Sequence, residues 1–233
     1  MVKGRRITKK ELREPDEFIT VTERAVHFVG DHGRKIIMGG VVVLIIAAGF
    51  FLFRMWEEKK EAEARRSLGQ VLAMVPRLNA QPQEAMAGEY KAVTEKLDEI
   101  IARFPRTTDG RFALLYKGNI ALRLGDHDGA IKSYSAFLDE GGKERLYQYF
   151  ALEGLGEAYK GKKEYDKALQ SYQKIVSLGE AVPLSDAYFN IGLCYERLGR
   201  SKEALESYKE FTKIAQKSQM TNIVLRKIAL LEK

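Results

Sequence analysis

The stretch that decides the fold is residues 185–218, SDAYFNIGLCYERLGRSKEALESYKEFTKIAQKS. Small residues and aromatics stand in it at fixed offsets, namely at Tyr188, Ile191, Gly192, Tyr195, Ala204, Tyr208 and Phe211. The same offsets recur in residues 111–144 and 149–182, so the pattern repeats after 38 and then 36 residues. A period of this length predicts pairs of helices, each of which buries its apolar face against the next pair.

The two earlier copies keep this register. The matching residues are Leu152, Leu155, Gly156, Tyr159, Ala168, Tyr172 and Ile175 in one copy, and Leu114, Gly118, Ala121, Ala130, Tyr134 and Phe137 in the other. Lys117 occupies a place in the first copy where a large apolar residue is usual. The glycines and alanines predict points where two helices cross closely. The pattern resembles that of tetratricopeptide repeat (TPR) proteins, which implies an all-α solenoid of three clear hairpins that acts as a binding scaffold.

Both ends of the repeat array need a cap, because a terminal hairpin has no neighbour on one side. Residues 222–233 carry Ile223, Val224, Ile228 and Leu231, which predict a capping helix with one apolar side. Residues 84–104 predict a helix that Pro105 ends. Together with residues 57–75 it is expected to form a degenerate hairpin, with Pro76 and Pro82 in its turn.

An uncharged apolar run, IIMGGVVVLIIAAGFFLF, occupies residues 36–53. As a helix it covers about 27 Å, close to the thickness of a bilayer's hydrocarbon core. Trp56 and the flanking Arg34, Lys35 and Arg54 suit the membrane interface. The sequence therefore predicts a basic N-terminal segment (1–35), a transmembrane helix (36–53), a stalk helix (54–76) and a TPR domain (77–233).

Charge alone decides the orientation of this helix poorly. Residues 1–35 hold nine Lys and Arg against six acids, which favours a cytoplasmic N-terminus. The residues just after the apolar run are also rich in Lys and Arg, which weakens the inference.

Composition argues against several classes of function. One cysteine, Cys194, and three histidines give no disulfide within the chain, no metal-ligand cluster and no catalytic dyad. Glycine-rich phosphate loops are absent from the sequence as well. The net charge of +7 is partly concentrated in the leader, where it fits anionic lipid better than nucleic acid. We therefore expect no enzyme, no cofactor, no metal, no nucleic acid and no small-molecule substrate.

The first helix of each hairpin is expected to line the concave face, where a protein or peptide would bind. The candidate groove residues are Leu115, Asn119 and Arg123 in the first repeat, Glu153, Glu157 and Lys160 in the second, and Phe189, Leu193, Glu196 and Arg197 in the third. Asn119 and Asn190 match part of the set that clamps a C-terminal carboxylate in some TPR domains. Leu115 and Glu153 stand where that set is basic, so no carboxylate clamp is predicted.

Residues 23–60, ERAVHFVGDHGRKIIMGGVVVLIIAAGFFLFRMWEEKK, followed by an amphipathic helix and TPR hairpins, resemble the YfgM-like family of ancillary Sec translocon subunits. The resemblance implies a short cytoplasmic N-terminus, one span of the bacterial inner membrane and a periplasmic TPR domain. It also implies partners among the translocon, exported proteins and periplasmic chaperones. The expected function is a membrane-anchored, chaperone-like adaptor. The alternative is a structural assembly factor for another envelope complex, such as a secretion or pilus apparatus.

Overall fold

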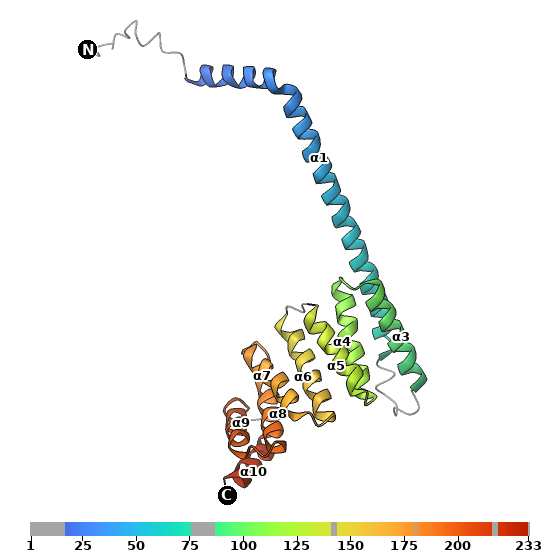
Figure 1. Cartoon of the computed structure of the whole chain (residues 1–233), viewed down its shortest axis with the longest axis vertical. Coiled ribbons are helices and arrows are strands. Elements are labelled where there is room, and N and C mark those ends of the chain that lie inside the picture. The colour runs from blue at the N-terminus through green and yellow to red at the C-terminus, as the bar shows by residue number, and fades with distance from the viewer. Residues whose placement is uncertain (1–16, 76–86, 141–143, 180, 216–218, 233) are drawn as a thin grey trace, which may run out of the picture. The chain divides into compact units, whose positions relative to one another are not determined.

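The computed structural model describes residues 17–75, 87–140, 144–179, 181–215 and 219–232, and its regular secondary structure in these ranges is helical (Figure 1). The helices are α1 (Glu17–Leu72), α3 (Ala87–Arg103), α4 (Thr108–Arg123), α5 (His127–Asp139), α6 (Arg145–Gly161), α7 (Tyr165–Ser177), α8 (Leu184–Arg197), α9 (Ser201–Ile214) and α10 (Thr221–Leu231). The chain divides into two units, residues 1–58 and 59–233. The predicted all-α fold class is confirmed.

The first unit contains the apolar part of α1. An 18-residue window in this helix has a mean hydropathy of 2.8, and none of the window is buried within the protein. Its large apolar side chains, from Val41 to Phe53, are exposed on every face. By its length and composition such a helix is able to span a membrane. A helix also meets the requirement that backbone N–H and C=O groups within lipid be hydrogen-bonded internally.

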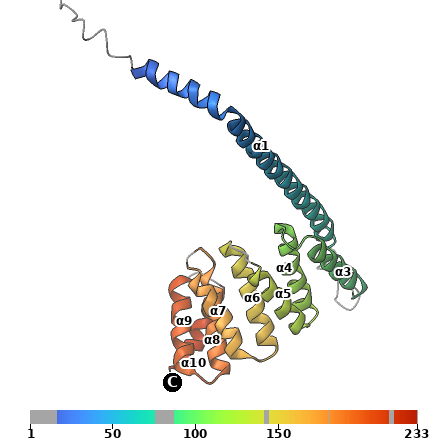
Figure 2. The same cartoon turned by 45° about the horizontal axis from the view of Figure 1, so that its top comes forward.

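The second unit is a stack of helical hairpins, drawn from teal to red in Figures 1 and 2. The three predicted hairpins are α4 with α5, α6 with α7 and α8 with α9, and successive helices pack against each other along the chain. The glycines of the repeat pattern permit this packing. A Cβ at Gly118, Gly156 or Gly192 would lie 2.7, 2.5 or 2.4 Å from the ring of Tyr134, Tyr172 or Tyr208, respectively. Each tyrosine comes from the second helix of the same hairpin, so the small residue makes room for the ring.

The last turns of α1 form the degenerate first hairpin with α3. Ala64, Leu68 and Val71 are buried in one cluster with residues of α3 that include Val93 and Leu97. The predicted helix 84–104 is observed as Ala87–Arg103, with Pro105 just beyond it. Residues 84–86 and the predicted turn with Pro76 and Pro82 lie outside the described residues.

Polar contacts join this hairpin to the next. The backbone N–H of Thr108, at the start of α4, donates to both carboxylate oxygens of Glu61 at 3.1 and 3.2 Å. Arg65 pairs with Asp109 at 3.6 Å. A carboxylate at a helix N-terminus is favourable because the first backbone N–H groups lack acceptors within the helix. Residues 61–72 of α1 therefore belong to the repeat stack by packing and by hydrogen bonding.

The C-terminal cap is α10. Val224 is fully buried against α9, and Ile228 and Leu231 pack beside it. Ile223, which was predicted to share this face, is 46% exposed instead. The inward stripe of α10 centres on Val224, and one residue earlier on a helix points about 100° away.

Candidate protein-binding groove

A hollow of about 530 Å³ opens on the side of the stack formed by α1, α4 and α6, which are first helices of their hairpins. Its lining consists of Leu68 and Leu72 of α1, Asp109, Phe112, Leu115, Tyr116, Asn119 and Leu122 of α4, Tyr134 of α5, and Tyr147, Phe150, Glu153, Gly154 and Glu157 of α6. Aromatic and aliphatic side chains dominate this set, and the polar groups are few. Ligand-binding sites on proteins commonly share this composition.

Aromatic rings form much of the lining of the hollow. The ring centroids of Phe112 and Tyr147 lie 4.4 Å apart, a contact that joins α4 to α6. Phe150, one turn along α6 from Tyr147, is 47% exposed although it is a large apolar residue. An exposed aromatic beside a concave apolar surface is typical of a place where another protein docks.

The predicted residues of α4 lie in three different settings. Leu115, a candidate groove residue, lines the hollow but is only 8% exposed. Asn119 lines the hollow, and its side-chain oxygen accepts a hydrogen bond of 2.7 Å from the Tyr134 hydroxyl. Arg123 lies outside the lining, with its guanidinium 5.8 Å from the centre of the Tyr90 ring.

Glu153 and Glu157 of α6 both line the hollow, but their settings differ. The Glu157 carboxylate accepts hydrogen bonds from the Tyr172 hydroxyl at 2.7 Å and from Lys160 at 2.8 Å. Glu153 forms no ion pair within the described part of the chain. Burial raises its pKa above 4.5, and the negative charges of Asp186 and Glu157 raise it further, while Tyr149 and Lys160 act in the opposite direction.

Lys160 links the second repeat to the third. Its ammonium donates to Glu157 on its own helix and, at 2.8 Å, to the side-chain oxygen of Asn190 on α8. Asn119 and Asn190, the two asparagines considered for a carboxylate clamp, thus both form side-chain hydrogen bonds inside the domain. Lys160 and Asn190 therefore stabilise the stack at this junction.

The predicted residues of α8 lie away from the hollow. Phe189 is half-buried, with its ring 6.1 and 6.2 Å from those of Tyr208 and Phe211. Glu196 accepts a hydrogen bond of 2.6 Å from Lys227 of α10, Leu193 is half-buried and Arg197 is exposed. The structure thus gathers Leu115, Asn119, Glu153 and Glu157 in one place, and it separates the remaining candidates from them.

Sequence reasoning missed the aromatic part of the lining. Phe112, Phe150 and Asp186 occupy one offset in the three repeats, three residues before Leu115, Glu153 and Phe189, respectively. Residues three apart on a helix share a face, so the candidate positions could have been extended by one turn to find them. Leu68 and Leu72 could not have been found in this way, because the first hairpin does not keep the repeat pattern.

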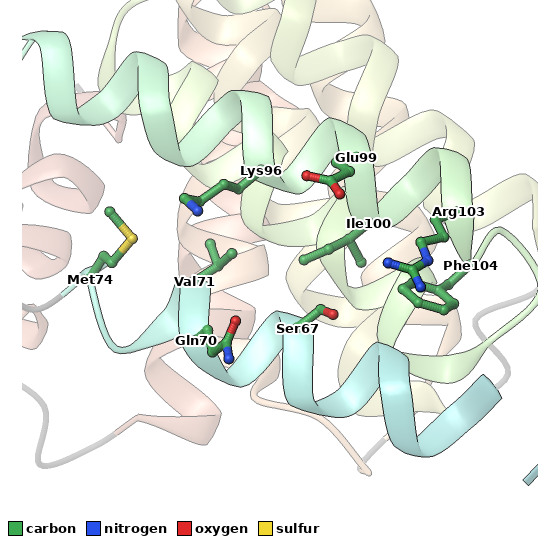
Figure 3. Close-up of a pocket in the computed structure, with 9 residues that line it drawn as sticks. All are labelled: Ser67, Gln70, Val71, Met74, Lys96, Glu99, Ile100, Arg103 and Phe104. Atoms are coloured by element: carbon green, nitrogen blue, oxygen red, sulfur yellow. The ribbon is translucent and has the colours of Figure 1, made fainter. Parts of the chain in front are cut away.

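A second, smaller hollow of about 270 Å³ lies at the seam between α1 and α3 (Figure 3). Ser67, Gln70 and Val71 border it from α1, and Lys96, Glu99 and Arg103 border it from α3. Arg103 pairs with Glu63 at 3.6 Å and lies 5.1 Å from the centre of the Phe104 ring. The Arg103 side chain thus faces Glu63 of α1 in a solvent-exposed ion pair, which contributes little to stability.

Cys194 is buried between α7 and α8, and burial raises the pKa of its thiol to about 11. At neutral pH it is a neutral thiol, which is a poor nucleophile. Among the described residues, no group of three or more His, Cys, Asp or Glu side chains is placed to hold a metal ion.

Solved structures with the same fold share little sequence with this chain. A tetratricopeptide repeat protein from Parabacteroides merdae is 18% identical with a TM-score of 0.57, covering 72% of this chain and 60% of its own. MamA from Desulfovibrio magneticus is 18% identical with a TM-score of 0.52, covering 67% and 77%. PilF of Pseudomonas aeruginosa is 17% identical with a TM-score of 0.52, covering 73% and 68%. At this identity the likeness shows the fold alone.

No curated protein sequence matches the chain at a significant level. The sequence profile of the tetratricopeptide repeat-like domain family, in contrast, matches residues 27–233. This match covers most of the chain, and it agrees with the stacked hairpins, the glycine-tyrosine contacts and the capping helix described above. The chain therefore belongs to the tetratricopeptide repeat-like domain family.

Proposed function

We propose that this chain is a single-span membrane protein whose TPR domain binds exported proteins and chaperones beside the Sec translocon. The observation that carries the proposal is the combination of an apolar helix exposed on all faces with a hollow lined by aromatic side chains in the same chain. The helix provides attachment to a bilayer, and the hollow provides a place for an apolar side chain of a partner.

The location in the bacterial inner membrane and the periplasmic orientation of the TPR domain rest on the resemblance of residues 23–60 to the YfgM-like family. Protease treatment tests this orientation. Digestion of the TPR domain in cells opened only at the outer membrane is expected. Digestion only in inverted inner-membrane vesicles would place the domain in the cytoplasm and contradict this part of the proposal.

The partners can be identified by photocrosslinking in cells. The photoreactive residue is best placed at Phe150, which is exposed and lines the hollow, rather than at Phe189, which packs against Tyr208 and Phe211. Lys132, exposed on α5 and outside the lining, serves as the control position. Many unrelated exported proteins captured at Phe150 would support the adaptor. One stoichiometric partner would favour the assembly factor, and capture no greater than at Lys132 would contradict the scaffold role.

A further inference from the structure

The hollow has an unbalanced negative charge at the edge nearest the third repeat. Phe150, Glu153 and Glu157 follow one another at intervals of three and four residues on α6, so they form a single strip along one face. Asp186, in the first turn of α8, is near enough to Glu153 to raise its pKa. On this face of α6, an aromatic side chain is thus followed by two carboxylates within about two turns of the helix.

The carboxylate of Glu153 has the Tyr149 hydroxyl as a hydrogen-bond partner but no cation paired with it among the described residues. The same offset holds Leu115 in the first repeat and Phe189 in the third, and both are apolar side chains that pack in the stack. Lys160, a cation two turns along the same helix, is already bonded to Glu157 and Asn190. Neither Glu153 nor Asp186 forms an ion pair with any residue that the structure describes. A half-buried carboxylate in this situation is disfavoured until a cation from outside compensates it.

We propose, building on the protein-binding role above, that the groove selects segments with a large aromatic or aliphatic side chain followed closely by Lys or Arg. The apolar side chain would occupy the hollow beside Phe112, Tyr147 and Phe150. The cationic group would lie between the carboxylates of Glu153 and Asp186. Opposite charge across an interface sets which partners bind, in addition to how tightly they bind.

Selection from a bead-displayed random octapeptide library tests this inference, with the full chain in detergent as the bait. The wild-type protein is expected to enrich peptides in which an aromatic residue is followed within three positions by Lys or Arg, by about tenfold over the same peptides with Glu or Asp there. Glu153→Gln should lose the preference for the basic residue and keep the preference for the aromatic one. Phe150→Ser should lose the preference for the aromatic residue, and it is expected to fold because about half of the Phe150 side chain is exposed to solvent.

Glu95→Gln is the matched control, since it removes one negative charge from an exposed position on α3 that does not line the hollow. It should behave as wild type. Enrichment of aromatic peptides without a preference for Lys or Arg, or the same preference in Glu153→Gln, would overturn the inference. Failure to enrich any peptide would also overturn it. The scaffold role is measured separately by crosslinking from Phe150 in cells, so crosslinks retained together with a negative peptide selection would contradict this inference alone.

Discussion

At the scale of single residues, the ring of Tyr134 lies close to two glycines of the repeat stack. A Cβ added at Gly118 of α4 would lie 2.7 Å from its ring, and one added at Gly154 of α6 would lie 2.3 Å from it. Its hydroxyl also donates to Asn119 at 2.7 Å. The ring is therefore held between two helices that belong to neighbouring repeats.

Replacement of Gly154 by alanine should displace this ring and weaken its bond to Asn119, lowering the free energy of unfolding by about 1–3 kcal/mol. Denaturant titration followed by circular dichroism measures the change. Gly69→Ala in α1 is the control, because no atom lies within 4 Å of the added Cβ. The control should be stabilising by about 0.5–1 kcal/mol, since alanine favours a helix over glycine. Equal effects from the two variants would contradict the close contact at Gly154.

Glu153→Gln should raise the thermal midpoint of the domain at neutral pH. The pKa of this carboxyl is raised above 4.5 in the folded state, chiefly by burial, so its negative charge opposes folding when it is ionised. The difference in thermal midpoint between the variant and the wild type should reach its full size above the raised pKa of Glu153. It should vanish as the pH falls below 4.5, because the wild-type carboxyl is then protonated in both states. A lower midpoint for the variant at neutral pH would show that Glu153 has a stabilising partner. A higher midpoint for the variant, in contrast, would show that the charge of Glu153 opposes folding, as expected of a charge that is kept for binding.

At the scale of elements, the turn between the two helices of a hairpin requires a left-handed residue at its second position. Gly125 and Gly199 occupy it in the first and third repeats with φ of 75° and 72°, whereas Lys163 occupies it in the second with φ of 62°. A side chain with a Cβ is disfavoured in this conformation.

Lys163→Gly should therefore stabilise the domain, and Gly199→Lys should destabilise it, each by about 1 kcal/mol. No atom lies within 4 Å of a Cβ built at Gly199, so conformation alone accounts for the second effect. Chemical denaturation of each variant measures the change in its free energy of unfolding. Changes of the same sign would contradict the assignment to backbone conformation.

The sequence predicted the three regular hairpins because their glycines, alanines and aromatics are tied to one packing geometry. Gly156, Ala168 and Tyr172 all lie at the crossing of α6 and α7, as their offsets indicated. The groove was predicted only in part, because the offsets identify the face of α4 and α6 but not how deeply each side chain lies. Leu115 is covered by its neighbours, and Phe189 packs on Tyr208 and Phe211 of α9 in its own hairpin. The spacing of the repeat pattern indicates neither depth.

At the scale of the whole molecule, the repeat stack includes the last turns of α1, which the sequence predicted both as part of a stalk (54–76) and as half of a degenerate hairpin (57–75). The buried side chains of Ala64, Leu68 and Val71 share a core with α3. A chain that starts at residue 59 is therefore expected to be soluble and to keep the cooperative unfolding of the domain. A chain that starts at residue 77 should expose the apolar side of α3 and lose several kcal/mol of stability, at about 25 cal/mol per Å² of uncovered surface.

Calorimetry and gel filtration of the two truncated chains measure this difference. Replacement of Leu68 by alanine in the longer chain should reproduce part of the loss, at about 2–5 kcal/mol for a buried leucine. Equal stability of the two truncated chains would mean that α3 needs no partner from α1, and would restore the boundary at residue 77.

The two junctions between regular repeats differ in chemistry. Between the first and second, α4 packs directly on α6 and the Tyr134 ring fills the space. Between the second and third, a buried apolar cluster joins α6 and α7 to α8, while Asn190 stands at the offset of Gly154 and accepts a hydrogen bond from Lys160. Water can replace a hydrogen bond at little cost, but it cannot replace a close-packed ring. A force that separates the repeats is therefore expected to open the hydrogen-bonded α6–α8 side of the second junction first, with the apolar contacts between α7 and α8 as the hinge.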